Sequence, residues 1–319
     1  MKKILCVLMS CLLFVMAGCS GHSKNLKFGA ADIGGVYYSF ASTFTQLADK
    51  EIDGYTFETK TTAGSVANLR LISDGYIDLA IVQADLLSDA YNATGTFTDK
   101  KYQKGYKAVA SLYTECCQIV VRKDSGITGI DDLINKTVSV GASESGSEKN
   151  AEQILKMSGI TDELINKVNM DYTEAAEKLK AGEIDAFFCT AGTRTEVIGQ
   201  LSKECDICLI SLDDKCIDKM LSAYSLCEKY TIPAGTYNGQ DSDVTTIGVK
   251  AVLIAKQSLS DDVIKNVTKT IYEHADDFKY ATSLDISFDI NTAADGVDIP
   301  FHSGAAAYYT ERGINVLTE

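Results

Sequence analysis

Short apolar runs alternate with segments of helical spacing, and this order occurs twice along the chain. The first pass has strand-like runs at 26–31, 55–61 and 77–82, with helical patterns at 37–50 and 65–73 between them. The second pass has strand-like runs at 137–141, 168–171 and 184–189, with helical patterns at 147–157 and 173–180. A β-α-β-α-β order is typical of an open parallel sheet covered by helices. The sequence therefore predicts an α/β fold with two doubly wound domains.

The segment between the two passes predicts how the domains are connected. Residues 111–126 form an extended apolar stretch with few breakers, and a second β-branched stretch covers 244–253. Each can carry the chain from one domain to the other. The helical pattern at 261–279 would then return to the first domain. We expect domain I at 26–120 plus 247–319 and domain II at 121–246.

The amino terminus has the pattern of a secretory leader. Lys2 and Lys3 precede an apolar run, Ile4 to Ala17, that is shorter than the ~20 residues of a membrane-spanning helix. The run ends in Met16-Ala17-Gly18-Cys19, which resembles the lipobox of bacterial lipoproteins. We expect a signal peptide at 1–18, lipid on Cys19, a tether at 19–25, and an extracytoplasmic protein anchored to a bacterial membrane. The alternative is an ordinary secretory leader with a chance cysteine.

Charge and cysteine content restrict the partners. The formal charge is −14, and removal of Lys2 and Lys3 with the leader takes it to −16, which argues against nucleic acid. Apart from the leader and Cys19, the chain has seven cysteines: Cys116, Cys117, Cys189, Cys205, Cys208, Cys216 and Cys227. Because the number is odd, at least one thiol is unpaired. The last four contain only one close pair, whereas a zinc site usually has two. We expect reduced, partly buried thiols, with one or two disulfides as the alternative, and neither a metal nor a cofactor.

Four loops with small residues follow predicted strands. They span 33–37, 62–65, 141–147 and 190–193, two in each pass. Ligands of open α/β sheets bind beyond the carboxyl ends of strands, where helix N-termini offer free N–H groups and about half a positive charge. The four loops therefore predict an anion site between the halves. Neither G-x-G-x-x-G nor G-x-x-x-x-G-K-[ST] occurs, which disfavours a nucleotide.

The candidate loops contain no recognisable catalytic set. The three histidines, His22, His274 and His302, lie outside these loops. Ser145 and Ser147 have no evident base nearby, and G-x-S-x-G is absent. We therefore expect a binding protein rather than an enzyme. A hydrolase or transferase on a related two-domain fold is the alternative from another class.

Several stretches together resemble one transport family. They are GGVYYSFASTFTQLADK, GSVANLRLISDGYIDLAIVQAD, ASLYTECCQIVVRKDSGI, SVGASESGSE, EAAEKLKAGEIDAFFCTAGT, TIPAGTYNGQDSDVTTIGV and IPFHSGAAAYYTERG. Between about residues 27 and 313 the chain resembles the TAXI family, the solute-binding subunits of one branch of TRAP transporters. The resemblance implies a two-domain fold of the type II periplasmic-binding-protein kind, with a ligand cleft between the domains. It also implies an ion-driven membrane permease as partner and a small carboxylate as ligand, such as glutamate or a related dicarboxylate. A ligand-sensing protein for a receptor or kinase is the alternative.

The resemblance also implies the ligand-binding residues. Positions that match the family's loops are Gly34, Gly35, Tyr37, Ser65, Gln83, Tyr113, Ser145, Gly146, Ser147, Ala191 and Gly192. Departures are Val36, Cys116-Cys117, Cys189 and Arg194, the last of which can add a charge contact or face solvent. These departures bear on which ligand is bound more than on whether one is bound.

Overall fold

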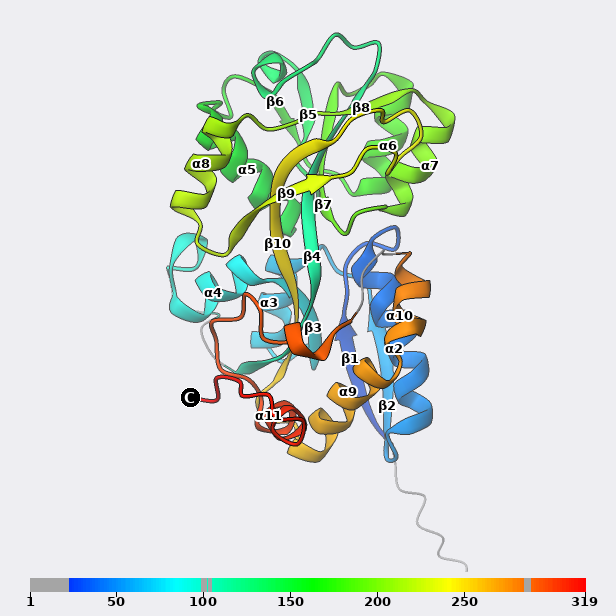
Figure 1. The fold of residues 1–319 in the computed structure, drawn as a ribbon, viewed down its shortest axis with the longest axis vertical. Coiled ribbons are helices and arrows are strands. Elements are labelled where there is room, and N and C mark those ends of the chain that lie inside the picture. Colours follow the sequence, from blue (N-terminus) through cyan, green and yellow to red (C-terminus); the bar gives the residue numbers. More distant parts are fainter. Residues whose placement is uncertain (1–22, 99–101, 103–104, 284–287) are drawn as a thin grey trace, which may run out of the picture.

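The chain folds into two lobes joined by two long strands. The computed structural model describes residues 23–98, 102, 105–283 and 288–319. Figure 1 shows the lobes one above the other, with β4 (Tyr106–Arg122) and β10 (Val244–Lys256) passing between them. The expected signal peptide, the lipidation site Cys19 and most of the tether lie outside the described residues.

Lobe 1 is built on the first β-α-β-α-β pass. Its strands β1 (Lys24–Gly29), β2 (Tyr55–Lys60) and β3 (Leu79–Gln83) are mutually parallel, in the order β2-β1-β3. The helices of this part are α2 (Val36–Glu51), α3 (Ser65–Ser73) and α4 (Ala84–Asn92), followed by the short η1 (Gly95–Phe97). Phe40 and Phe44 of α2 pack on Phe28 of β1, which explains the apolar face of this helix.

Lobe 2 repeats this arrangement in the middle of the chain. Its strands are β5 (Thr137–Ser139), β6 (Asn166–Val168), β7 (Ala186–Ala191), β8 (Ile207–Leu209) and β9 (Cys227–Ile232). Its helices are α5 (Gly146–Ser158), α6 (Tyr172–Ala181), α7 (Glu196–Glu204) and α8 (Asp214–Ala223), with the short η2 (Ile130–Leu133). Strand β5 is parallel to β6 and β7, as the second pass predicts.

The two lobes have separate cores on one continuous sheet. Strands β4 and β10 run antiparallel, and the sheet order β2-β1-β3-β10-β4-β7-β5-β6 connects both lobes. Core residues as far as Tyr113 on β4 belong to lobe 1, whereas Cys117 and the residues after it pack in lobe 2. On β10 the division falls between Ile247 and Val249. The α/β fold class is confirmed. The domain ranges 26–120 plus 247–319 and 121–246 stay a prediction.

The C-terminal part returns to lobe 1 and differs from the sequence expectation in one respect. It comprises α9 (Asp261–Glu273), α10 (Ala275–Thr282), η3 (Ile290–Thr292) and α11 (Ser303–Thr310). The single helix expected at 261–279 is wrong, because the chain leaves helical geometry at His274, with φ −115° and ψ 29°. The His274 ring lies between Glu51 of α2 and Asp277, and these contacts hold the break.

Two helices of lobe 2 show how the sequence sets their ends. Ser145 and Asp171 precede α5 and α6, and each side chain accepts a hydrogen bond from a first-turn N–H group. Gly159 and Gly182 close the same helices at φ 81° and 76°, a conformation that glycine adopts without steric cost. The fixed starts of α5 and α6 matter below, because both face the other lobe.

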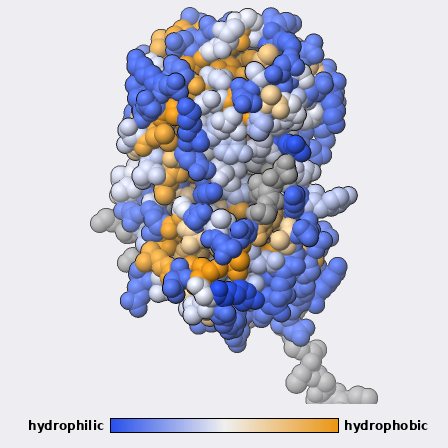
Figure 2. Space-filling model, in the orientation of Figure 1, coloured by the Kyte–Doolittle hydropathy of each residue, from blue (hydrophilic) through white to orange (hydrophobic). Residues whose placement is uncertain are grey.

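The surface carries apolar side chains in separate places. Figure 2 shows a mainly hydrophilic face on which apolar atoms form several small groups. Large exposed apolar residues are scattered over both lobes, and they include Ile33, Tyr76, Leu164 and Tyr280. In the part of the chain that the structure describes, no helix has the length and apolar character to cross a bilayer.

Candidate functional site

A small cavity lies between the lobes at the carboxyl ends of the parallel strands. Its volume is about 40 Å³, counted as the space open to the centres of water-sized molecules. Its walls come from both lobes, including the starts of α2 and α3 in lobe 1 and of α5 and α6 in lobe 2. This is where open α/β sheets place their ligands.

Most of the residues expected from the sequence line this cavity. They are Gly35, Tyr37, Ser65, Gln83, Ser145, Gly146, Ser147 and Ala191. Three expected residues do not line it. Gly34 faces a wider depression outside the cavity, and the Gly192 carbonyl accepts a hydrogen bond from Thr195. Tyr113 is buried near Glu115 and Tyr172, and its hydroxyl has no hydrogen-bond partner.

Two helix N-termini of lobe 1 open onto the cavity without a side-chain cap. Gly35 precedes α2 and Gly64 precedes α3, and neither can supply a capping side chain. The first N–H groups of a helix have no partner within the helix. Gly64 has φ 121°, and its position is close to the Ser145 backbone of the other lobe, so a side chain there would be strained. These two termini can therefore donate hydrogen bonds to an anion.

The α5 terminus of lobe 2 faces them, with its hydroxyl groups already engaged. Ser145 Oγ accepts from the Glu148 N–H at 3.0 Å. Ser147 Oγ accepts from the Thr190 N–H at 2.8 Å and shares a hydrogen bond with the Tyr172 hydroxyl at 2.6 Å. What Ser145 to Ser147 can offer a ligand is therefore mainly backbone N–H groups.

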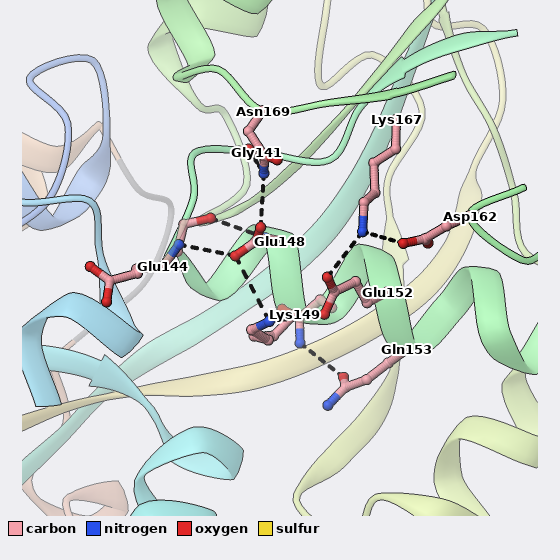
Figure 3. Close-up of polar contacts among 11 residues, drawn as sticks. Gly141, Glu144, Glu148, Lys149, Glu152, Gln153, Asp162, Lys167 and Asn169 are labelled. Atoms are coloured by element: carbon pink, nitrogen blue, oxygen red, sulfur yellow. Dashed lines mark hydrogen bonds and ion pairs between the residues drawn. The ribbon is translucent and has the colours of Figure 1, made fainter. Parts of the chain in front are cut away.

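A polar network holds the loop before α5 in shape. Glu148 accepts hydrogen bonds from the Glu144 N–H at 3.0 Å and from Asn169 Nδ2 at 2.9 Å (Figure 3). Asn169 Nδ2 also donates to the Gly141 carbonyl at 2.9 Å, and Lys149 lies 3.8 Å from the Glu148 carboxylate. The loop is therefore fixed from within lobe 2, whereas the Glu144 side chain points toward lobe 1 (Figure 3).

Direct contacts close the lobes around the cavity. Arg70 of α3 holds the Glu144 carboxylate with two hydrogen bonds, at 3.0 and 2.7 Å, and the Ala67 N–H donates to the Glu144 carbonyl at 3.1 Å. Deeper in the seam, Gln83 Nε2 donates to Asn150 Oδ1 at 3.0 Å. The structure is thus a closed form.

Sequence reasoning missed the acidic residues of the cavity. Asp32, Glu115 and Asp171 line it together with Tyr172, and none of the four was expected. Glu115 lies in the middle of β4 and is 3% exposed. Its Oε2 accepts a hydrogen bond from the Tyr37 hydroxyl at 2.8 Å. The sequence did contain a signal for Glu115, since it is a charged residue inside the apolar run at 111–121. A strand buried on both faces excludes an unpaired charge, so such a residue must have a partner or a function.

Burial changes the protonation of these carboxyl groups. It raises the pKa of Glu115 to about 8, although hydrogen bonds from Tyr37 and Gln83 oppose the rise. The pKa of Asp32 is also raised, by burial and by the neighbouring Asp171 charge, against hydrogen bonds from the Ile33 and Gly34 N–H groups. Perturbed acids in a cleft are typical of functional sites.

The seven cysteines that the structure describes are all unpaired. All seven cysteines from Cys116 to Cys227 are free thiols, so the disulfide alternative is not what the structure shows. Cys116, Cys117 and Cys189 are buried, and burial raises the pKa of each thiol. Within residues 23–98, 102, 105–283 and 288–319, no group of three or more His, Cys, Asp or Glu side chains is placed to hold a metal ion.

Comparison with known proteins identifies the fold. A model of the NMT1-like family matches residues 28–313. A protein from Bordetella bronchiseptica RB50 is 17% identical, with a TM-score of 0.53 over 82% of this chain and 76% of that one. The periplasmic binding protein BugD is 11% identical, with a TM-score of 0.55 over 81% and 85%. PhnD1 from Prochlorococcus marinus, solved with methylphosphonate, is 13% identical, with a TM-score of 0.54 over 83% and 93%. At these identities the likeness establishes a periplasmic-binding-protein fold.

Proposed function

The chain belongs to the NMT1-like family, and from this premise we propose that it is an extracytoplasmic solute-binding protein that holds a small carboxylate between its lobes. One observation carries the proposal. The N-termini of α2 and α3 in lobe 1 and of α5 in lobe 2 converge on one buried cavity. Each terminus offers free N–H donors and a partial positive charge, which suit a carboxylate and act strongly in a dry cleft.

The proposed ligand class starts from the resemblance to TAXI proteins. Glutamate and related acidic amino acids or dicarboxylates are the first candidates. Tyr37 provides a flat wall beside the α2 terminus, and Gln83 provides a carboxamide that donates and accepts hydrogen bonds. Arg194, which the sequence left open as a charge contact, is exposed and does not line the cavity.

The proposed partner is a TRAP-type permease. In this proposal the lipid on Cys19 holds the protein at the membrane, and the closed form delivers its ligand to the permease. The fold supports delivery of a solute, and the TAXI resemblance at 27–313 supports the TRAP type. A permease gene next to the gene for this chain, and co-purification of the two proteins, would support the pairing, whereas failure to co-purify any TRAP-type permease would contradict it.

A thermal screen tests ligand binding. Acidic amino acids and four- to six-carbon dicarboxylates are added to the purified protein, and the melting temperature is measured. A ligand at about 100 times its dissociation constant stabilises the native state by ~2.7 kcal/mol, a rise of a few degrees for a chain of this size. Should a sugar shift the midpoint while every carboxylate fails, the carboxylate proposal is wrong and the fold assignment alone stands.

Gly35→Val provides the matched variant for this screen. A Cβ at Gly35 would lie 3.2 Å from the Asp32 carbonyl oxygen and would cover the N–H groups at the start of α2. We expect the variant to fold and to lose the ligand-induced shift. Gly199→Ala is the control, because a Cβ at Gly199 meets nothing within 4 Å.

A further inference from the structure

The cavity is lined by acids and lacks basic side chains. Asp32, Glu115 and Asp171 contribute three carboxyl groups. Among the described residues that line it, none is Lys, Arg or His. Arg70, which contacts lobe 2 across the seam, is already paired with Glu144. A ligand with two carboxylates would thus bring one of them close to an acid with no side-chain cation to balance it.

Unpartnered acceptors point to a ligand that donates hydrogen bonds. Gln83 lines the cavity and is 1% exposed, and its Oε1 has no hydrogen-bond partner. Its Nε2 donates to Asn150 and to the Glu115 carboxyl group, which leaves the carbonyl as the free end. Asp32 Oδ2 is also buried without a partner. Buried acceptors are costly unless a donor meets them, and an ammonium group supplies three N–H donors and a positive charge.

The surface beside the cavity is also acidic. A wider depression shares Asp32 and Asp171 with the cavity wall, so it forms the outer mouth of the cleft. Its other charged residues are Glu177, Glu196, Glu204 and Lys180, and Lys180 is paired with Glu204. An acidic mouth attracts positively charged groups and slows the entry of dianions. Among the described residues, no group of three or more His, Cys, Asp or Glu side chains is placed to hold a metal ion.

We propose that the ligand carries a positively charged nitrogen, which lies against Glu115, Asp32 and the free Gln83 carbonyl while its carboxylate faces the helix N-termini. The inference rests on the proposed function. It narrows the proposed ligand class to amino acids and excludes hydroxy acids and dicarboxylates without nitrogen. Glu115 suits this role, because burial raises its pKa in the empty cleft, whereas a positive charge beside a carboxylate lowers the pKa and favours the charged pair.

Matched pairs of acids that differ only in the nitrogen test the inference. The probes are glutamate and 2-hydroxyglutarate, alanine and lactate, and leucine and 2-hydroxy-4-methylpentanoate, with agmatine as an amine that lacks a carboxylate. Isothermal titration measures each affinity. In every pair that binds, we expect the amino acid to bind at least tenfold more tightly. A hydroxy acid that equals its amino partner overturns the inference, as does a failure of every nitrogen compound to bind.

The arms of this experiment separate the inference from the proposed function. Binding of agmatine without any binding of amino acids would support the nitrogen subsite and contradict the carboxylate proposal. Binding of 2-hydroxyglutarate and glutamate with equal affinity would support the carboxylate proposal and contradict the nitrogen subsite. Mass spectrometry of any molecule that co-purifies with the chain adds a direct readout, since an elemental composition without nitrogen contradicts the inference.

Two variants identify the residues. Glu115→Gln keeps the hydrogen bond to Tyr37 and removes the charge, so the preference for the amino member of a pair should fall at least tenfold. Asp32→Asn removes the second charge that the proposal places beside the nitrogen, and it tests the inference if Glu115→Gln fails to fold. Asp124→Asn is the matched control, because its side chain is 86% exposed and lies outside both the cavity and its mouth. An unchanged preference for the amino member of each pair in both Glu115→Gln and Asp32→Asn would contradict the proposed contact between these acids and the nitrogen.

Discussion

Glu115 illustrates at the residue scale how a binding site costs stability. The pKa of its carboxyl group rises from 4.5 to about 8 in the folded protein, chiefly because of burial. Between these pH values the unfolded chain has lost the proton and the folded protein still binds it, so stability falls as the pH rises through this window. At 1.36 kcal/mol per pKa unit, the loss amounts to roughly 5 kcal/mol by pH 8.

Replacing Glu115 with Gln should therefore stabilise the empty protein in a pH-dependent way. We expect the melting temperature of Glu115→Gln to approach that of the parent at pH 5 and to exceed it clearly at pH 8. Thermal unfolding of both proteins at the two pH values is the measurement. Glu163→Gln, on an exposed turn, is the control. A difference between Glu115→Gln and the parent that is the same at both pH values would contradict the assigned cause.

At the element scale, the start of α5 is shaped by its contact with the opposite lobe. A Cβ at Gly146 would overlap the carboxamide of Gln83, which is held by Asn150. Alanine suits a helix better than glycine, so the cost of Gly146→Ala arises between the lobes and not within α5. In the variant, either Gln83 leaves Asn150 or the lobes stay apart.

Gly146→Ala should therefore weaken ligand binding without weakening the empty protein. We expect at least a tenfold loss of affinity for the ligand found in the thermal screen, with the melting temperature of the empty protein unchanged or raised. Gly199→Ala, which adds the same methyl group to α7 in open space, should bind normally. If Gly146→Ala binds as the parent does, Gln83 moves aside freely and the close contact has no functional role.

At the scale of the whole molecule, the lobes are connected so that they can rotate. Two strands join them, and the cores divide between Tyr113 and Cys117 on β4 and between Ile247 and Val249 on β10. These two adjacent crossings are the proposed hinge. The Arg70–Glu144 ion pair connects the two lobes in the closed form. We expect the empty protein in solution to be more open than this closed form, and the ligand to shift it toward the closed form.

Small-angle X-ray scattering measures this closure. The radius of gyration should fall when the ligand is added at saturation, and it should fall less for Gly146→Ala than for the parent. Scattering curves that do not change at saturation, in a sample shown to bind by titration, would contradict closure by the ligand.

Anchoring is a second property of the whole chain. The Met16-Ala17-Gly18-Cys19 pattern predicts that Cys19 bears the lipid, so Cys19→Ala should move the protein from the membrane fraction to the supernatant of lysed cells. Cys205→Ala, which removes a partly exposed thiol from the folded part, should stay with the membrane. Retention of Cys19→Ala in the membrane fraction would show that another segment holds the protein.

The sequence by itself determined the repeated β-α-β-α-β order, because apolar periodicity and capping residues such as Ser145 and Asp171 act locally. It also located most of the loops that surround the cavity, since small residues after a strand mark helix starts. Only the tertiary structure decided which of these loops meet, and it brought Glu115 from the middle of β4 to Asp32 and Asp171. Spacing along the chain does not report such contacts, because they depend on how two lobes close against each other. The acidic character of the cleft, which no single loop displays, follows from that closure.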